Sequence, residues 1–281
     1  MKRIIINADD FGWSSEVNRG VLECHLDGIL TSTTLLMNGP ALDNAVEIAK
    51  ANPTLGVGVH MNIVRGKPLS DPAKIPTLIN RNGNFPGSAE LVLLRMMLGR
   101  IAELEIKVEL EAQLSRFRQC LGAPTHVDSE KHMHAFAPFS LAAVSIAQTE
   151  GIAAMRCPME REFGANPATM QRFKSWLLLR SAAQLGALCR QAGIKISDSF
   201  VGIADTGRMT AARYRDIFDL AQDGLTEVMT HPGYFSETEH KDFPSGFIKD
   251  TREIEMKGLQ EDGLKEYAEA REIKLIHFGQ L

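Results

Sequence analysis

The sequence predicts an α/β protein built as a (β/α) barrel, a distorted TIM-like barrel with seven or eight strands. Short apolar runs, often β-branched, alternate along the chain with longer helical patterns, and this alternation favours a parallel sheet with helices outside. A length of 281 residues is ordinary for one such domain. Polar and ionisable residues also recur where the predicted strands end, which is the functional edge of a barrel. A doubly wound open sheet is the alternative.

Each predicted element follows from its period and its boundaries. Strands are expected where short apolar segments are bounded by polar or turn-forming residues, at 3–8, 33–38, 56–62, 125–129, 153–156, 196–202, 226–230 and 274–278. Helices are expected between them, at 15–27, 41–51, 139–150, 211–223 and 251–271.

We expect residues 1–281 to form a single domain that carries two insertions. Residues 65–85 are rich in Pro, Gly and Asn, which is typical of a loop or lid. Residues 164–195 form a helical pattern without an acidic residue. A basic amphipathic helix of this kind can lie on an anionic membrane. Alternatively, its leucines face the barrel or a dimer partner and its cations are solvated. Its basic and apolar side chains are Arg172, Phe173, Lys174, Trp176, Leu177, Leu178, Leu179, Arg180, Arg190 and Lys195.

Composition limits the partners and the compartment. A net charge of −4 gives no overall attraction for nucleic acid. The four cysteines are scattered without a CxxC pair, so free thiols in a reducing compartment are expected rather than a thiolate zinc site. Only three apolar residues separate Arg3 from Asn7, too few for a signal peptide or a membrane span. We therefore expect a cytoplasmic protein, peripheral to the inner membrane if residues 164–195 bind lipid. A homodimer is an open expectation.

Two adjacent carboxylates, Asp9 and Asp10, directly follow the apolar run Ile4–Ile6 and precede Gly12. Like charges repel, and they cost more when they are buried. A divalent cation would offset that repulsion. The alternative is a pair of exposed acids on a turn or at the start of the next helix.

A second cluster, Thr125–His134, packs three histidines and two acids into ten residues. His60 stands near the end of the apolar segment Gly56–Asn62. Taken alone, a histidine there is more often a hydrogen-bonded core residue, but beside an Asp pair and a His/Glu cluster it favours metal ligation. A hydrolytic metal site needs about three protein ligands and an open position.

The segments NADDFG, TSTTLLMNG, GVGVHMN, THVDSEKHMH and EVMTHPG occur in this order, and together they resemble the YdjC/ChbG family of carbohydrate deacetylases. The resemblance implies a barrel-like fold, a divalent metal, and removal of the acetyl group from N-acetylglucosamine units of small glycans or glycoconjugates. It also implies that Asp10, His60 and a residue after Asp128 bind the metal.

The third ligand departs from the common pattern of that family, because Glu130 stands where many members carry histidine. The form DSEKHMH resembles the hopanoid-biosynthesis-associated (HpnK) branch, for which deacetylation of a glycolipid is inferred. We therefore assign the third ligand to Glu130, with His132 or His134 as alternatives. Two anionic ligands and one neutral ligand would make bound water harder to ionise. The expected cofactor is one divalent ion, Mg²⁺ first, with Mn²⁺, Zn²⁺ or Co²⁺ as alternatives.

Amide hydrolysis also needs a general base and a general acid. Asp9 is the expected base because it adjoins the ligand Asp10; alternatively it caps the next helix or binds the metal. His231, before a Pro-Gly turn, is expected to protonate the leaving amine; alternatively it holds that turn. Arg156 would orient a carboxylate or bind substrate, or form an ordinary surface ion pair.

The remaining polar residues at strand ends have expected roles in binding substrate or in orienting the ligands. Asn38 and Asn62 are assigned to sugar hydroxyls or to the ligands, His126 and Asp128 to the ligands, and His132 and His134 to the sugar. The expected substrate is an acetylated amino-sugar glycan or glycolipid. The alternatives are a metal-dependent phosphoesterase and a carbohydrate-binding protein with a degenerate site.

Overall fold

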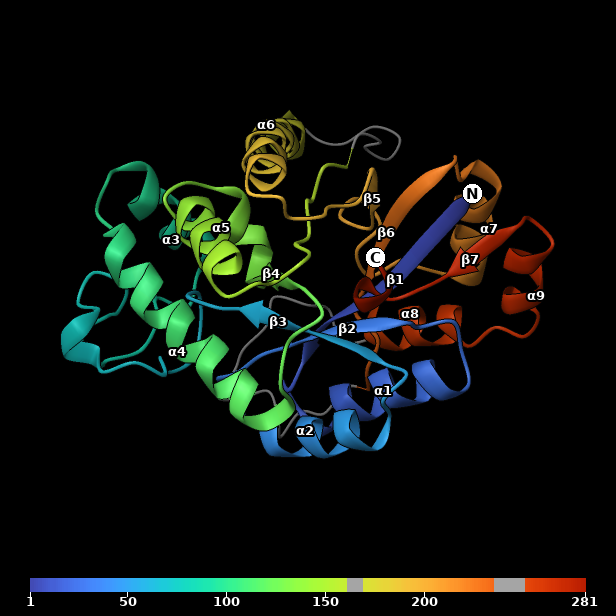
Figure 1. The fold of residues 1–281 in the computed structure, drawn as a ribbon, viewed down its shortest axis with the longest axis horizontal. Coiled ribbons are helices and arrows are strands. Elements are labelled where there is room, and N and C mark those ends of the chain that lie inside the picture. Colours follow the sequence, from blue (N-terminus) through green and yellow to red (C-terminus); the bar gives the residue numbers. More distant parts are fainter. Residues whose placement is uncertain (161–168, 235–250) are drawn as a thin grey trace.

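The computed structural model describes residues 1–160, 169–234 and 251–281, and within the helix that begins at residue 169 it describes side chains from residue 176 onward. It shows an all-parallel sheet that curves into a barrel with helices outside, so the predicted fold class is confirmed (Figure 1). The strands are β1 (Lys2–Phe11), β2 (Ser32–Leu35), β3 (Gly56–Met61), β4 (Val127–Ser129), β5 (Ser199–Val201), β6 (Gly224–Thr230) and β7 (Ile273–Leu275).

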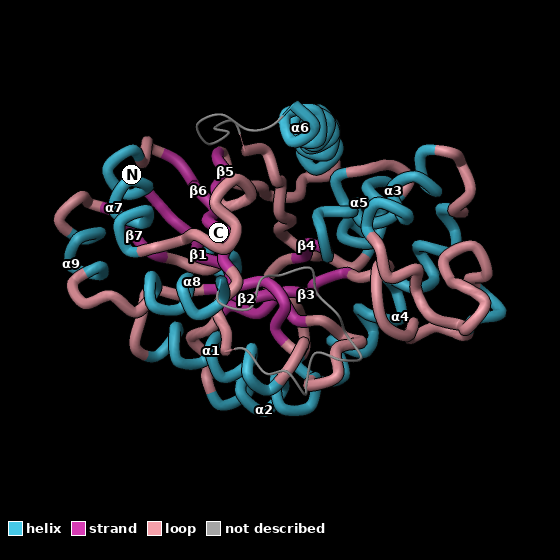
Figure 2. Tube along the Cα trace, turned by 180° about the vertical axis from the view of Figure 1, so that it is seen from behind, coloured by secondary structure: helices cyan, strands magenta, loops and turns pink. Residues whose placement is uncertain are grey.

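The helices cover the outside of this sheet, with α1 and α2 on one side and α3, α4 and α5 at one end (Figure 2). The α-helices are α1 (Ser15–Leu26), α2 (Leu42–Ala51), α3 (Ala89–Met97), α4 (Glu103–Leu121), α5 (Phe139–Thr149), α6 (Thr169–Gln191), α7 (Ala211–Leu220), α8 (Thr251–Leu259) and α9 (Leu264–Glu269). Short 3₁₀ helices are η1 (Pro72–Lys74), η2 (Glu130–Ala135) and η3 (Phe278–Gln280).

The ring of strands closes through a segment that forms only single bridges. The regular sheet runs β4-β3-β2-β1-β6-β5. Met155 bridges Val127 of β4, and Ala154 bridges Lys195, which lies just before β5. Four backbone hydrogen bonds of 2.9–3.2 Å support these bridges. Residues 153–156 were predicted as a strand, and they occupy a strand position, but they are too short and irregular to form a regular ladder.

Alternation along the strands divides the barrel interior into an apolar lower part and a polar upper part. Successive side chains of a strand point to opposite faces. Near the amino-terminal ends of the strands, a separate apolar cluster fills the interior, formed by Ile5, Ala154, Leu225, Ile276 and Phe278. Two residues further along the same strands, the buried side chains are Asn7, Arg156 and Glu227. The polar groups therefore gather toward the carboxyl ends of the strands.

Glycines in β3 leave room for histidines inside the barrel. A Cβ atom at Gly58 would lie 2.5 Å from the ring of His126, and one at Gly56 would lie 2.5 Å from the Cβ atom of His277. Both separations are far below contact distance, so a larger side chain at either glycine would clash with a histidine. His60 is the next inward position on this strand, because side chains alternate.

The boundaries of two predicted elements differ from the structure. Residues 251–271 were predicted as one helix, but the chain forms α8 and α9 with a turn between them. Gly263 has a φ of 78° at the start of α9, a left-handed conformation that glycine adopts readily and that interrupts a helix. The first strand extends through Phe11, beyond its predicted end at residue 8, and so includes Asp9 and Asp10.

The insertion at 65–85 is a loop fastened to α4. The buried carboxylate of Glu109 accepts hydrogen bonds from the backbone N–H groups of Leu69 and Ser70, each at 3.0 Å. Ile75 and Phe85 are buried in the main core. These contacts hold the loop in place.

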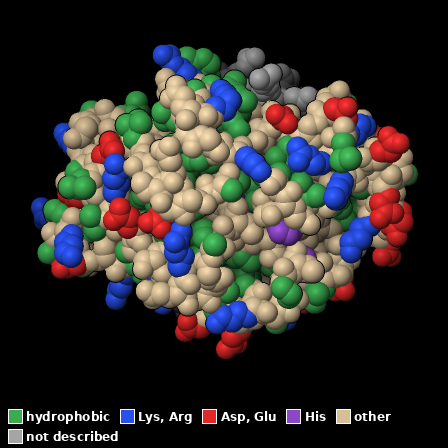
Figure 3. Space-filling view, in the orientation of Figure 1, with side chains coloured by type: hydrophobic (Ala, Val, Ile, Leu, Met, Phe, Trp, Pro, Cys, Tyr) green, Lys and Arg blue, Asp and Glu red, His purple; other side chains and the backbone are tan. Residues whose placement is uncertain are grey.

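The predicted helical insertion contains α6, whose side chains are described from Trp176 onward. Trp176 is 52% exposed, and the guanidinium carbon of Arg180 lies 5.8 Å from its ring centroid. Arg172, Phe173 and Lys174, which contribute to the membrane hypothesis, lie outside the residues with described side chains. Among the described helices, none combines the length and the apolar character that crossing a membrane requires. On the face seen in Figure 3, basic and acidic side chains are interspersed.

Candidate metal centre and active site

A bulge in β1 places both adjacent aspartates inside the barrel. The pairing of β1 with β2 shifts register between Ala8 and Phe11, and Asp10 has a φ of 69°. In a regular strand Asp9 and Asp10 would point to opposite faces, but the bulge redirects one of them. Both carboxylates are consequently buried, with exposed fractions of 4% and 3%.

Asp10, His60 and Glu130 present three potential ligand atoms to one point. Each residue offers one atom, and all three atoms lie within 4.8 Å of one another. The Nε2 atom of His60 is 3.9 Å from Oδ1 of Asp10 and 3.6 Å from Oε2 of Glu130. The three residues come from β1, β3 and the residue directly after β4. This is the set of ligands that the sequence predicts.

His60 is oriented by the hydrogen bonds of its other ring nitrogen. Its Nδ1 atom lies 2.7 Å from Oδ1 of Asp128 and 3.1 Å from Oγ1 of Thr34. Thr34 Oγ1 also donates to Oδ2 of Asp128, at 3.1 Å. A carboxylate behind one imidazole nitrogen is the usual support of a metal-binding histidine, because it fixes the ring and leaves the opposite nitrogen facing the ion.

Two arginines neutralise the two carboxylates of this cluster from outside. Arg252 of α8 donates to Oδ2 of Asp10, and Arg65 donates to Oε1 of Glu130. Burial raises the pKa of Asp10, but Arg252, His231 and His60 outweigh it and hold that pKa well below its usual range. Burial likewise opposes ionisation of Glu130, and Arg65 and His60 lower its pKa. Both acids are therefore anionic at neutral pH.

The donor set fits a divalent cation. Two carboxylate oxygens and one imidazole nitrogen suit Mg²⁺, Mn²⁺ or Zn²⁺. In each acid, the oxygen facing His60 is not the one bound by an arginine. Ligands at about 2.1 Å from an ion stand about 3–3.5 Å apart, close to the observed separations. In a second group, Asp9, His60 and Asp128, the potential ligand atoms also lie within 4.8 Å of one another. In this group, however, Arg156 binds both oxygens of Asp9 and also contacts Asp128.

Asp9 is held by a bidentate ion pair at the centre of a buried network. Arg156 donates from Nη1 and Nη2 to the two oxygens of Asp9, each at 2.7 Å. The same guanidinium lies 2.7 Å from Asp128 and 2.6 Å from Glu227. Arg156 is completely buried, so the alternative of a surface ion pair is wrong. It links the expected base, Asp9, to the carboxylate that orients His60.

Glu227 in β6 is a buried acid that the sequence analysis did not single out. Burial raises its pKa to about 7 even though Arg156 opposes that shift. Its Oε1 atom accepts from Nε of Arg156, and its Oε2 atom has no hydrogen-bond partner among the described residues. One guanidinium thus serves three carboxylates.

His231 at the end of β6 pairs with a second unpredicted acid, Glu255 of α8. Nδ1 of His231 lies 3.6 Å from Oε2 of Glu255, and the same oxygen accepts from the backbone N–H of His231. Thr230 also donates to that oxygen, at 2.9 Å. Burial opposes the charge of Glu255, but the contacts with His231 keep its pKa below the usual value. An anionic carboxylate therefore lies beside the His231 ring.

The asparagines expected to meet sugar hydroxyls instead fix the backbone of the loop that carries Arg65. Oδ1 of Asn62 accepts from the backbone N–H of Arg65 at 3.2 Å, and Nδ2 of Asn62 donates to the backbone carbonyl oxygen of Arg65 at 2.9 Å. Asn38 Nδ2 donates to the same oxygen and to that of Lys67, each at 3.0 Å. A hydrogen bond of 3.0 Å joins the two amides. Both side chains therefore act on the cluster through Arg65.

The histidines of Thr125–His134 occupy three different environments. His126 stacks on Phe278, with centroids 3.8 Å apart, in the lower interior, so it does not join the cluster at the ligands. His134 uses both ring nitrogens, toward Ser129 Oγ at 2.6 Å and the Arg156 carbonyl at 3.1 Å. His132 lies edge-on to Phe200 at 5.9 Å. Lys131 and His132 interrupt η2 with left-handed backbone conformations, at φ values of 52° and 55°.

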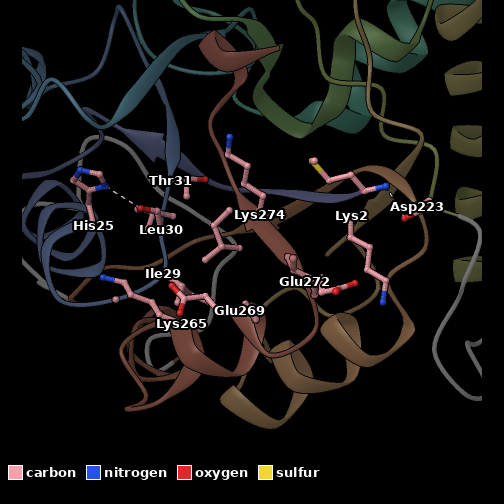
Figure 4. A pocket seen from close by; sticks show the side chains of 15 residues that line it. Lys2, His25, Ile29, Leu30, Thr31, Asp223, Lys265, Glu269, Glu272 and Lys274 are labelled. Carbon is pink, nitrogen blue, oxygen red and sulfur yellow. Dashed lines mark hydrogen bonds and ion pairs between the residues drawn. The ribbon is translucent and has the colours of Figure 1, made fainter.

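A separate cavity of about 980 Å³ lies at the opposite end of the barrel (Figure 4). It is lined near the amino-terminal ends of β1, β2, β6 and β7 by residues that include Lys2, Lys265 and Lys274. The predicted site residues do not line it. This cavity is therefore distinct from the place where the buried acids and His60 meet.

The fold and the site together define an α/β barrel with a buried Asp/His/Glu cluster at the carboxyl ends of its strands. The family model of YdjC-like proteins matches residues 3–270, and the chain belongs to this family.

Two curated relatives are carbohydrate deacetylases and a third is a chitooligosaccharide deacetylase. The Brevibacillus brevis enzyme is 33% identical over 282 residues, which is 99% of both chains. The mouse enzyme is 35% identical over 83% of this chain and 78% of its own. The chitooligosaccharide deacetylase of Proteus mirabilis is 43% identical over 140 residues, 47% of this chain and 50% of its own.

The solved structures support the architecture. A crystal structure from Enterococcus faecalis, of a suggested cellobiose-phosphate cleavage protein, covers 99% of this chain and 98% of its own with a TM-score of 0.80. At 24% identity, this likeness shows the fold alone.

Proposed function

We propose that this protein is a metal-dependent carbohydrate deacetylase that removes the acetyl group from N-acetylglucosamine-type units of a small glycan or glycolipid. The observation that carries the proposal is the convergence of Asp10, His60 and Glu130 on one point, beside the expected base and acid. The carbohydrate deacetylases among its relatives supply the reaction class, and their similarity extends over most of the chain.

Asp10, His60 and Glu130 would hold the cation. When bound there, a divalent ion would polarise the acetyl carbonyl and make a neighbouring water more acidic. Asp128 and Thr34 keep the Nε2 atom of His60 directed at the ligand position. The two carboxylates supply hard oxygen donors, which favours Mg²⁺ or Mn²⁺, with Zn²⁺ and Co²⁺ as alternatives.

Asp9 would take the proton of the attacking water. The bidentate contact with Arg156 fixes its orientation. Because Oδ1 also accepts from Nδ2 of Asn7 at 3.1 Å, Oδ2 is the oxygen with a further lone pair for water. Positioning of this kind raises the rate because the base need not be reoriented during the reaction.

His231 would donate a proton to the departing nitrogen, so that the products are acetate and the free amine. The buried carboxylate of Glu255 lies 3.6 Å from Nδ1 of this ring, and a histidine is a common general acid in such a step. Asp10 adjoins the same imidazole closely enough for His231 to lower its pKa. Base and acid would thus come from two adjacent strands, Asp9 from β1 and His231 from the residue that follows β6.

The test is acetate release by metal-stripped protein that is resupplied separately with Mg²⁺, Mn²⁺, Zn²⁺ or Co²⁺. Substrates would be chitobiose, longer chitooligosaccharides and an N-acetylglucosaminyl lipid, with p-nitrophenyl phosphate included to detect phosphoesterase activity. Metal-dependent acetate from any glycan, abolished in His60→Ala and retained in the surface variant Arg118→Gln, supports the proposal. Phosphate release without acetate, or glycan binding without either product, would contradict it.

A further inference from the structure

Two arginines bind the carboxylate ligands from the side that faces away from His60. Arg252 contacts Oδ2 of Asp10, whereas Oδ1 is the oxygen near His60. Arg65 contacts Oε1 of Glu130, whereas Oε2 is the oxygen near His60. The arginines therefore alter the charge of the donor set without occupying the donor atoms.

Both guanidinium groups lie near one buried indole. Their central carbons are 4.7 Å (Arg65) and 5.4 Å (Arg252) from the ring centroid of Trp13. Trp13 is fully buried, and the two arginines are nearly so. A cation over an indole face is favourable, so the ring helps to keep two like charges in the same region.

The two arginines offset the charge of the two carboxylate ligands. Asp10 and Glu130 contribute two negative charges and the arginines contribute two positive charges, and the imidazole of His60 is neutral once it ligates a cation. Without the arginines the donor set would carry a charge of −2 and attract a divalent ion far more strongly. The same negative charge would also neutralise the ion's ability to polarise a carbonyl group.

We propose that Arg65 and Arg252 are positioning residues that weaken cation binding at Asp10, His60 and Glu130 and thereby preserve the ion's electrophilic strength. This inference rests on the proposed function for the identity of the site, and it concerns a property that can be measured without turnover. Arg65 and Glu130 act as one charge-balanced unit, and Arg252 and Asp10 act as another.

The loop architecture gives Arg65 a fixed place in this unit. Asn62 and Asn38 hold the backbone of Arg65 through its N–H and carbonyl groups. Glu109 and Gln113 of α4 hold the adjoining residues, Ser70 and Asn62. The loop thus fixes the backbone of Arg65, and its side chain is buried beside Glu130.

The test is calorimetric titration of metal-stripped Arg65→Gln with Mn²⁺ and with Zn²⁺, with Arg65→Lys and the surface variant Arg118→Gln as controls. Arg65→Gln should bind both ions at least tenfold more tightly than the parent protein. Arg65→Lys and Arg118→Gln should bind within about threefold of the parent. Unchanged or weaker binding by Arg65→Gln, in protein whose thermal unfolding is cooperative, would overturn the inference.

A charge-conserving pair of substitutions separates electrostatics from local disruption. Glu130→His keeps a ligand atom but leaves Arg65 unbalanced, so it should weaken Mn²⁺ binding at least tenfold. Adding Arg65→Gln restores the net charge and should recover at least tenfold of that affinity. Failure of the second substitution to restore binding would contradict charge balance as the cause. If deacetylation fails for every glycan while these affinities behave as expected, the proposed function is wrong and the inference about the arginines stands.

Discussion

The Nδ1 atom of His60 lies 2.7 Å from Oδ1 of Asp128, and this contact determines which ring nitrogen faces Asp10 and Glu130. The same carboxylate lies 2.7 Å from Arg156, which in turn holds Asp9. Asp128 thus connects the Asp10, His60 and Glu130 cluster to Asp9, the proposed base. The orientations of His60 and Asp9 both depend on this shared group.

Asp128→Asn should reduce metal affinity by about 10- to 100-fold, because partners that orient a ligating histidine typically contribute that much. Calorimetric titration with Mn²⁺ or Zn²⁺ would measure the change. Asp219→Asn, at an exposed ion pair with Arg271, is the matched control and should leave affinity unchanged. Affinity within twofold of the parent in Asp128→Asn would show that Asp128 does not support His60.

Asp9→Asn should lower kcat for acetate release by about 10²- to 10⁴-fold, the usual contribution of a general base. Metal affinity should change by less than about threefold, because Asp9 is bound by Arg156 and not by the ligand set. Kinetics and titration on the same preparation would check both expectations. A large loss of metal binding would instead assign Asp9 to the ligands.

His231→Gln should impair amide hydrolysis much more than ester hydrolysis. A departing amine needs a proton, whereas p-nitrophenolate leaves without one, so loss of a general acid affects only the first. We expect about a 10²-fold or larger loss in kcat on chitobiose and less than a tenfold loss on p-nitrophenyl acetate. Asp9→Asn is the comparison, since it should slow both substrates. Equal losses in His231→Gln would remove it from the role of acid.

Glu227→Gln should stabilise the protein at alkaline pH. Burial raises the pKa of Glu227 from 4.5 to about 7, so the folded state binds its proton more tightly than the unfolded state does. Below pH 4.5 both states are protonated and the group contributes nothing. Stability falls as pH rises from 4.5 to 7, and above pH 7 the penalty is constant at roughly 3 kcal/mol.

Urea unfolding of Glu227→Gln at pH 5 and pH 8 would measure this effect. The variant should exceed the parent's free energy of unfolding clearly at pH 8 and only slightly at pH 5. Glu47→Gln, at an exposed position of α2, should follow the parent at both values. An equal difference at both values, or a loss of stability at pH 8, would contradict a raised pKa at Glu227.

The strand–helix alternation predicted the fold well because each element carries its own local signal. Seven of the predicted strand segments overlap the strands of the structure, and the inward positions follow the period of two. The bulge at Asp9 and Asp10 could not be predicted in this way, because it arises from a register shift against β2. The sequence placed both acids near the site, and only the three-dimensional pairing explains how both point inward.

The ligand cluster was predicted from motifs, whereas its charge partners were not. Arg252 and Asp10 lie 242 residues apart, and Arg65 and Glu130 lie 65 residues apart. No local pattern relates residues at such separations. Glu227 did leave a weak signal, as a single acid inside the apolar segment Leu225–Met229, and a period of two would have placed it on the interior face.

The polar side chains of the second cluster show a different limit. A dense group of histidines indicated chemistry, but it did not separate ligands from structural residues. Both ring nitrogens of His134 form hydrogen bonds, with Ser129 and with the carbonyl of Arg156, and His126 packs on Phe278. The three-dimensional position of each histidine in the barrel distinguishes these roles.

The segment that closes the barrel is also held by the ion pairs of the candidate site. Residues 153–156 join their neighbours by single bridges, yet Arg156 at their end ties together acids from β1, β4 and β6. A part of the wall with few ladder hydrogen bonds is therefore spanned by three buried ion pairs. A substitution of Arg156 would therefore alter the closure of the barrel and the orientation of the buried acids at the same time.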